Sequence, residues 1–199
     1  MPIPYINVRA DEHVRHPLEF QWSDEHRGLR LSYKDPVPQD WMYGVLWTRQ
    51  GMVSTGRPEY RTVHTARQRR CMLQSLCQVC KHSAVDPENG RIWWLFPTPE
   101  RYLFTNALGE YYSHIAPTCQ TCIPISLAHC PHLREEAVSC TVAGVEPYAV
   151  HADVYQPRPD QSAELIARDA LVQLEQFQVL GSALAKQLVV AFVDLRVSP

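Results

Sequence analysis

The sequence lacks the motifs of several common enzyme classes. It contains no glycine-rich phosphate cradle, no Gly-x-Ser-x-Gly elbow and no histidine with a glutamate two residues later. Phosphate-binding loops, α/β-hydrolase nucleophiles and zinc-dependent cytidine deaminases each depend on one of these patterns. The sequence therefore argues against these three classes of protein.

Long apolar runs and a strong charge of either sign are also missing. The longest apolar run, residues 188–193, is much shorter than the roughly 20 residues that cross a bilayer. Residues 1–10 lack the basic segment and apolar core of a signal peptide. The formal net charge is -2, which predicts no general attraction to nucleic acid or membranes. We expect a cytoplasmic protein with no membrane partner, and the sequence leaves its oligomeric state open.

Glycine is scarce relative to proline: 8 glycines against 16 prolines predict stiff, loop-rich connections. Hydrophobic residues make up 45% of the chain and charged residues 20%, which is typical of a globular protein. We predict a single domain over residues 1–199 with four parts. These are an N-terminal arm (1–27), N-terminal strands with a basic helix (28–76), a zinc-binding unit (77–133), and C-terminal strands with a helix (134–199).

Cysteine is arranged in two close pairs, Cys77-x-x-Cys80 and Cys119-x-x-Cys122. Two intervening residues let both sulfurs of a pair reach one ion. Two such pairs are typical of a tetrahedral zinc site in a reducing compartment, with disulfides as the alternative. Pro117 before the second pair and the apolar run after it predict a helix start, whose free N–H groups favour thiolates. We predict Zn²⁺ bound by all four cysteines, and we expect the zinc to be structural because four thiolates fill its coordination sphere.

Apolar patterning predicts two strands and a helix in the N-terminal half. Apolar and polar residues alternate over 28–34, and aromatic and branched residues fill 43–47, so these segments are expected to pair antiparallel. Residues 64–76 are predicted as a helix that leads into the first cysteine pair. Its inner side is expected to consist of Ala66, Met72, Leu73 and Leu76.

The C-terminal half is predicted to complete an α+β fold. Residues 92–96 read as a buried strand with 102–112 as its partner, and a helix from Cys119 ends before Pro131. A loop with the first cysteine pair (the knuckle), then a hairpin over 92–112, then a helix that carries the second pair follow one another in the order of a treble-clef zinc finger. Residues 138–155 predict two strands, and 163–174 fit either a strand or a first helical segment. Three- and four-residue steps predict a C-terminal amphipathic helix with the stripe Phe177, Leu180, Leu184, Leu188, Ala191, Phe192 and Leu195. The predicted fold is thus an antiparallel sheet with a treble-clef-like four-cysteine site and this helix.

The most basic part of the chain lies on the helix before the cysteines. Arg67, Arg69 and Arg70 could pair with phosphates in a two-pronged manner. A solvated helix face accounts for the same charges. These three arginines are the candidate contacts for a protein or nucleic-acid partner.

Three further groups of residues could carry chemistry. His114-Ile115-Ala116-Pro117 resembles the base-bearing strand of a His-Asn-His nuclease, but His114 lies only five residues before Cys119 and lacks an Asp-His partner pair; packing beside the zinc is the alternative. Cys130, between His129 and Pro131, could act as a nucleophile. Either Cys130 or His132 could instead replace one of the four cysteine ligands of the zinc. Cys71, Cys130 and Cys140 otherwise read as small buried hydrophobes. His13, His16 and His26 could be imagined as a second metal site, although their spacing matches no ligand pattern.

Several of these segments together resemble a group of uncharacterised actinobacterial treble-clef zinc-finger-like proteins. The resemblance rests on Leu76-Cys77-Gln78-Val79-Cys80, Pro117-x-Cys119-x-x-Cys122 and Cys130-Pro131-His132-Leu133, and it extends to residues 44–47, 64–70 and 184–190. It implies a small soluble cytoplasmic protein and no particular activity. Relatives are expected to carry glycine after the first pair, where this chain has Lys81.

The patterns favour a zinc-stabilised, non-catalytic module that binds a protein or nucleic-acid partner, with regulation as one role that fits such a module. The alternative is an enzyme. It would be either a divergent His-Asn-His-like nuclease or a small-molecule tailoring enzyme with structural zinc, whose pocket uses the aromatic and histidine-rich N-terminal half.

Overall fold

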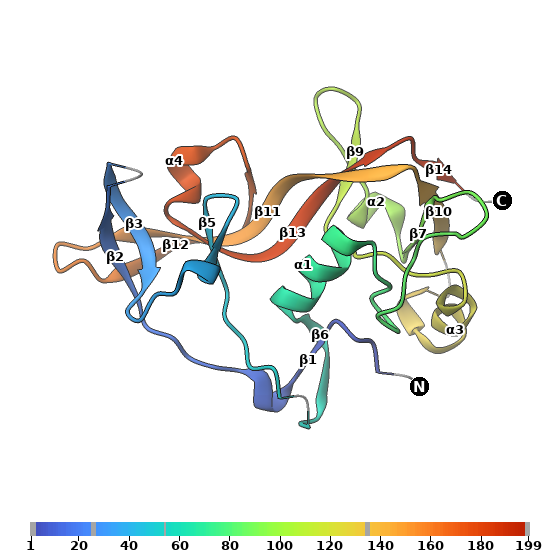
Figure 1. Ribbon diagram of the computed structural model, residues 1–199, viewed down its shortest axis with the longest axis horizontal. Coiled ribbons are helices and arrows are strands. Elements are labelled where there is room, and N and C mark those ends of the chain that lie inside the picture. The colour runs from blue at the N-terminus through green and yellow to red at the C-terminus, as the bar shows by residue number, and fades with distance from the viewer. Residues whose placement is uncertain (1–2, 25–26, 54, 134–135, 198–199) are drawn as a thin grey trace. The chain divides into compact units, whose positions relative to one another are not determined.

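A computed structural model of the chain describes residues 3–24, 27–53, 55–133 and 136–197. The contacts divide the chain into two compact units. The first unit is drawn from residues 1–7, 60–148 and 189–199, and the second from residues 8–59 and 149–188. Four strands contribute residues to both units: β1 (Asn7–Arg9), β6 (Pro58–Val63), β11 (Gly144–Pro157) and β13 (Ala183–Val193) (Figure 1). That the two units act as a single domain stays a prediction.

The first unit is built around a three-stranded antiparallel sheet in the order β14 (Arg196–Val197), β10 (Val138–Val142), β7 (Ile92–Phe96). Strand β7 pairs with β10 along its whole length, and not with residues 102–112 as predicted. The latter residues instead form the short hairpin of β8 (Phe104–Thr105) and β9 (Tyr111–Ser113), and β9 pairs with β13. Trp94 of β7 is fully buried, and its ring centre lies 5.0 Å from that of Phe192 of β13. Strands β7 and β13 therefore contribute side chains to the same core.

The first unit also contains the helices α1 (Thr65–Gln74), α2 (Pro99–Tyr102) and α3 (Cys122–His129) and the 3-10 helix η3 (Pro131–Leu133). The predicted helix over 64–76 is present, and His64 caps it by accepting a hydrogen bond from the N–H of Arg67. Its predicted inner side was partly wrong. Leu73 is exposed, whereas Cys71 and Met72 are buried together with the polar Gln68. The inner face is therefore mixed in polarity, which apolar spacing alone does not detect.

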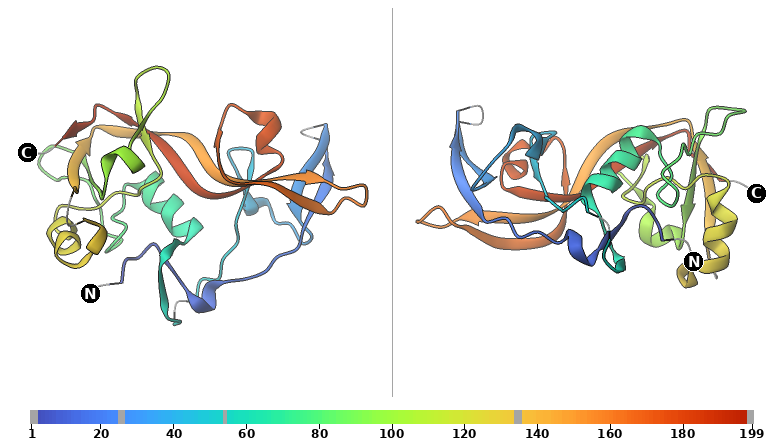
Figure 2. Two further views of the ribbon diagram at one scale, coloured as in Figure 1. Left: turned by 180° about the vertical axis from the view of Figure 1, so that it is seen from behind. Right: turned by 60° about the horizontal axis from the view of Figure 1, so that its bottom comes forward.

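The second unit contains a sheet in the order β12 (Ala163–Gln173), β11, β13, β5 (Val45–Trp47), β4 (Trp41–Met42). Strands β11 and β13 lie side by side in the centre of this order (Figure 2). Strands β4 and β5 form a hairpin whose turn residues Tyr43 and Gly44 both have positive φ, as a two-residue type I′ turn requires. Strand β11 pairs antiparallel with β12 and β4 pairs antiparallel with β5, whereas β13 and β5 are parallel.

A two-stranded sheet of β2 (Leu18–Ser23) and β3 (Gly28–Tyr33) completes the second unit, with the short helices η1 (Ala10–Glu12), η2 (Pro38–Asp40) and α4 (Phe177–Leu180). The expected pairing of 28–34 with 43–47 is wrong because β3 pairs with β2. Phe20, Leu31, Tyr33 and Leu46 form a buried cluster there. The segment predicted as an N-terminal arm contains β1, η1 and β2, and Val8 and Phe20 in these strands are fully buried.

The predicted C-terminal helix is a strand over most of its length. Only α4 is helical, and β13 occupies residues 183–193. The buried residues of β13 are Ala183, Ala185, Leu188, Val189, Val190 and Phe192, so burial alternates near both ends of the strand but is continuous over residues 188–190. This break in the alternation lets the three- and four-residue steps of a helix fit the same residues. Branched valines at 189, 190 and 193 favour the strand.

The coarse fold class is confirmed: the chain is a mixed α+β protein with mainly antiparallel sheets and a cluster of four cysteines. Residues 163–174, left open between strand and helix, form β12. Residues 138–155 form two strands as predicted, β10 and β11. Among the helices of the described residues, none has the length and apolar character needed to cross a membrane.

Candidate metal centre

The first unit gathers four thiols at one point. The sulfurs of Cys77, Cys80, Cys119 and Cys122 all lie within 4.8 Å of one another, and Cys80 Sγ is 3.8 Å from Cys119 Sγ. A tetrahedron with Zn–S bonds of about 2.3 Å has sulfurs about 3.8 Å apart. The donor set and its spacing therefore fit a zinc ion, as a closed site with four sulfur ligands and no position left for water or substrate.

A tight loop presents the first cysteine pair. The N–H of Lys81 donates to the carbonyl of Cys77 (2.9 Å), and the N–H of Cys77 donates to the carbonyl of His82 (2.7 Å). Lys81 adopts a φ of 63°, the left-handed conformation that usually favours glycine. The N–H of Val79 also points at Cys77 Sγ (3.4 Å). The loop thus folds back on itself so that both sulfurs face the same side.

The start of α3 presents the second pair. Cys122 is the first residue of this helix, and its N–H and that of Ile123 donate to the carbonyl of Cys119 (2.9 and 3.1 Å). Pro124 occupies the first turn, where no intrahelical partner for its nitrogen is required. The helix predicted from Cys119 thus begins three residues later, at Cys122, and the turn that precedes it brings Cys119 and Cys122 together.

Gln78 ties the two halves of the site together without a metal. Its side-chain amide donates to the carbonyl of Ala116 (2.8 Å) and to the hydroxyl of Thr118 (2.9 Å). Its backbone N–H donates to the carbonyl of Pro117 (2.8 Å), and the N–H of Thr118 donates to the carbonyl of Trp93 (3.0 Å). Sequence reasoning assigned no role to Gln78. Its position inside the first cysteine pair was the signal that could have found it.

The N-terminal segment also contacts the knuckle loop. The N–H groups of Tyr5 and Ile6 donate to the carbonyls of Val79 and Gln78 (both 3.1 Å). The backbone of the loop is therefore hydrogen-bonded both to residues 5–6 and to residue 117. These bonds hold the loop in its observed conformation without a metal.

The four thiols differ in their environments. Burial raises the pKa of Cys119 to about 11 and also raises that of Cys122. Burial acts in the same direction on Cys80, but hydrogen bonds from the backbone of His82 and from the side chains of Cys122, His82 and Cys77 together outweigh it and lower the pKa of Cys80 to about 7. A dication would shift all four toward the thiolate, because a coordinating thiol is deprotonated.

The other three cysteines lie outside this cluster, and all seven carry free thiols. Burial raises the pKa of both Cys71 and Cys140 to about 12, so these two are protonated at neutral pH and read as packing residues. Cys130 is partly exposed at the end of α3, where its N–H donates to the carbonyl of Ser126. The neighbouring His129 uses Nδ1 to bond the carbonyl of Ile125 (2.8 Å).

The three candidate arginines do not form one surface. Arg67 is 6% exposed; its Nη1 donates to the carbonyl of Asn7 (3.0 Å) and its guanidinium lies over the ring of Tyr5. Arg69 is partly buried, and only Arg70 is exposed, with Nε bonded to Gln74. Arg67 therefore anchors the N-terminal segment, a role that its charge in the sequence did not reveal.

The histidines considered for catalysis or for a second metal site do not belong to a metal-binding cluster in the described residues. Within the described residues, the four cysteines are the only group of three or more ligating side chains close enough to hold an ion. The ring of His114 packs edge-on against Tyr102, and its carbonyl accepts a hydrogen bond from Gln68. His13 pairs with Glu59 (2.8 Å) and His16 with Arg49, both in the second unit. His26 lies outside the described residues.

Comparison with protein-family models, with curated proteins and with solved structures finds no match to this chain. Function is therefore inferred from the geometry of the site.

Proposed function

We propose that this chain is a zinc-stabilised, non-catalytic module, and that the zinc-bearing part of the first unit binds a protein partner. The observation that carries the proposal is the convergence of four cysteine sulfurs within 4.8 Å. The proposal includes two further points. The site is arranged like a treble clef, and the chain is related to the actinobacterial proteins that its sequence resembles.

A structural role follows from the donor set. Four thiolates leave zinc without an open position, so the ion can fix the knuckle loop against α3 but cannot activate a water. His82 hydrogen-bonds Cys80, as outer partners that orient metal ligands do, and Gln78 joins the knuckle loop to residues 116–118. The binding energy of the metal would add to the folding energy of this unit.

The surface of α3 favours a protein over nucleic acid. Its eight residues carry no Lys, Arg, Asp or Glu, and Pro124, Ile125, Leu127 and Ala128 are exposed. Apolar side chains held on a rigid element are typical of protein interfaces, whereas nucleic-acid affinity depends on cations. Arg67, the first of the candidate cations, is buried. A protein partner at α3 is therefore the better-supported form of the proposal.

Cobalt substitution tests the metal half. Purified full-length chain should bind one Co²⁺, with intense thiolate-to-metal charge-transfer absorption and the visible bands of tetrahedral Co²⁺ sulfur coordination, and one Zn²⁺ should displace it. Cys77→Ser should abolish or strongly weaken these bands. Cys130→Ser is the matched control and should retain them. Full bands in Cys77→Ser, or their loss in Cys130→Ser, would contradict the ligand set.

The partner half is tested by quantitative capture from an extract of the source cells. Wild type, Leu127→Asp and the control Leu108→Asp would be compared by mass spectrometry, since Leu108 is an exposed leucine of the same unit, in the β8–β9 turn. A specific protein should be retained by wild type and Leu108→Asp and lost by Leu127→Asp. Retention by all three, or salt-sensitive capture of nucleic acid alone, would count against a protein partner at α3.

A further inference from the structure

The second unit contains a cavity of about 430 Å³ that the metal centre does not involve. Its apolar wall includes Val14, Leu18 and Leu184, and its polar wall includes Arg15, His16 and Arg49. This volume lies within the range of small-molecule sites, which combine apolar walls with a few placed polar groups. No acidic residue lines the cavity among the residues that the structure describes.

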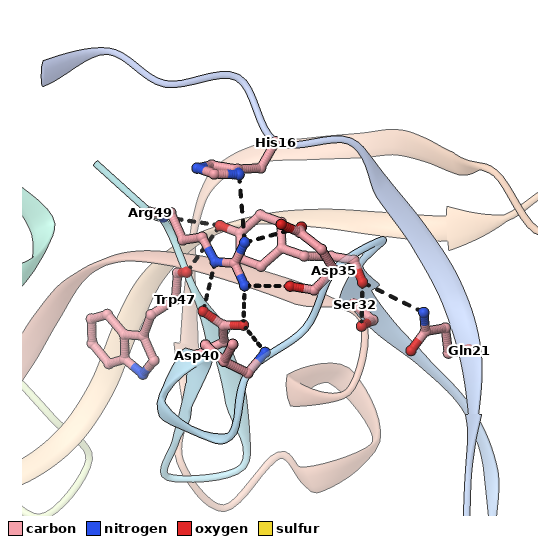
Figure 3. A network of polar contacts seen from close by, with 9 residues as sticks. His16, Gln21, Ser32, Asp35, Asp40, Trp47 and Arg49 are labelled. Carbon is pink, nitrogen blue, oxygen red and sulfur yellow. Dashed lines mark hydrogen bonds and ion pairs between the residues drawn. The ribbon is translucent and has the colours of Figure 1, made fainter. Parts of the chain in front are cut away.

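Arg49 is a fixed part of this wall. Its Nε and Nη2 donate to the two carboxylate oxygens of Asp40 (2.7 and 2.6 Å), and further bonds reach the side chain and carbonyl of Asp35 (3.1 and 2.8 Å) (Figure 3). The guanidinium also lies 4.3 Å from the ring centre of Tyr33. Asp40 neutralises the charge of Arg49, so Arg49 positions its neighbours and is not the principal cation for a ligand.

His16 is oriented by Arg49. Its Nδ1 lies 3.5 Å from Arg49 Nη1, as Figure 3 shows, and its ring stands edge-on to Tyr33 at 5.4 Å. A guanidinium can only donate, so Nδ1 must accept and the proton of the neutral ring resides on Nε2. The contact with Arg49 therefore makes Nε2–H the donor that His16 can offer to a ligand.

Arg15 supplies the remaining positive charge. It is exposed at the cavity and forms no hydrogen bond or ion pair with the other described residues. An available guanidinium, a histidine donor and apolar walls are complementary to an anion attached to a flat apolar body. We propose that this cavity binds a small organic anion, such as an aromatic carboxylate or sulfonate, with Arg15 and His16 at the anionic group. This site is independent of the proposed zinc function.

A pair of fluorescent probes that differ only in charge tests the inference. The full-length protein would be titrated with 8-anilinonaphthalene-1-sulfonate and with its uncharged counterpart N-phenyl-1-naphthylamine. The sulfonate should bind saturably at one site per chain and more tightly than the uncharged probe. Arg15→Gln should weaken the sulfonate about tenfold, which is the usual scale for one charge-assisted hydrogen bond, and leave the uncharged probe unchanged.

One control variant and one further test variant complete the experiment. The control Arg61→Gln removes the same charge from an exposed arginine of the other unit and should leave the affinity for both probes unchanged. His16→Phe keeps a ring against Tyr33 but deletes the donor, so it should weaken the sulfonate selectively. Equal affinity for the two probes, a sulfonate dissociation constant within twofold of wild type in Arg15→Gln, or an equal loss in Arg61→Gln would overturn the proposal.

Discussion

The first unit joins a loop to a helix start 39 residues further along the chain through four cysteine sulfurs. The second unit holds its loop at residues 35–40 with one arginine, whose guanidinium bonds to Asp40 and Asp35 and stacks on Tyr33. Both arrangements fix a short connecting segment, and the second of these segments ends in the 3-10 helix η2. Under the proposed function the first arrangement depends on an added ion, whereas the second depends only on the chain, so the two units should respond differently to chelators, to pH and to single substitutions.

Removal of the metal should produce the largest difference between the units. Structural zinc contributes on the order of 10 kcal/mol in small zinc-dependent folds, so chelation should expose amides of residues 77–81 and 119–129 to exchange. Amides of β11 and β12 in the second unit should remain protected over the same period. Hydrogen-exchange mass spectrometry with and without a zinc chelator measures both regions in one sample. Equal loss of protection in both units would contradict a metal dependence confined to the first.

Asp40→Asn should have the next largest effect, and in the second unit. Asp40 is 6% exposed and bonds Arg49 through both oxygens, and loss of one partner of a buried ion pair costs about 3 kcal/mol. Urea unfolding should show this loss in the signal of the second unit, with zinc binding unchanged. Asp35→Asn is the matched control, because the Asp35 side chain is 73% exposed and its pair with Arg49 should contribute less than 1 kcal/mol. Similar losses in the two variants would contradict a dominant role for Asp40.

The same variant gives a pH test. Burial alone would raise the pKa of Asp40, but the hydrogen bonds from Arg49 outweigh it and hold the pKa below its ordinary value of 3.8. A depressed folded-state pKa stabilises the fold above the unfolded value, and this contribution is lost as the pH falls through the folded value. The stability difference between wild type and Asp40→Asn should therefore be constant near neutral pH and shrink below about pH 4. A difference that grows on acidification would refute the assignment.

Gln78→Ala should have the smallest effect of the series. It removes two hydrogen bonds that join the knuckle to residues 116–118 but leaves all four sulfurs in place. Loss of such an outer partner typically weakens metal affinity about tenfold or somewhat more. Competition with a chromophoric chelator measures the affinity. Gln74→Ala, an exposed glutamine of the same unit, should leave the affinity unaltered.

The two loop-fixing arrangements also differ in how far the sequence predicts them. Cys-x-x-Cys spacing limits what the cysteines can do, so the cluster and the helix start after Pro117 could be predicted. Arg49, Asp40 and Tyr33 follow no motif, because a single arginine pairs with any carboxylate that the fold brings near it. Arg67 shows the same limit: its charge suggested a surface, whereas the fold places it over Tyr5.

Strand partners were less predictable than strands. Residues 28–33 and 92–96 form strands as their patterns indicate, but their partners β2 and β10 follow from the arrangement of the whole chain. Strand β13 was missed because its buried residues do not alternate over residues 186–190, where two partly exposed residues are followed by three buried ones. Periodicity assumes a regular alternation between two faces, and a strand with such a break does not meet that assumption.

X-ray absorption at the zinc edge of the purified protein tests the central claim most directly. The account predicts one shell of four sulfur atoms at about 2.3 Å, with no nitrogen or oxygen ligand. A shell containing nitrogen or oxygen at about 2.0 Å, or no bound zinc in a folded protein, would contradict it.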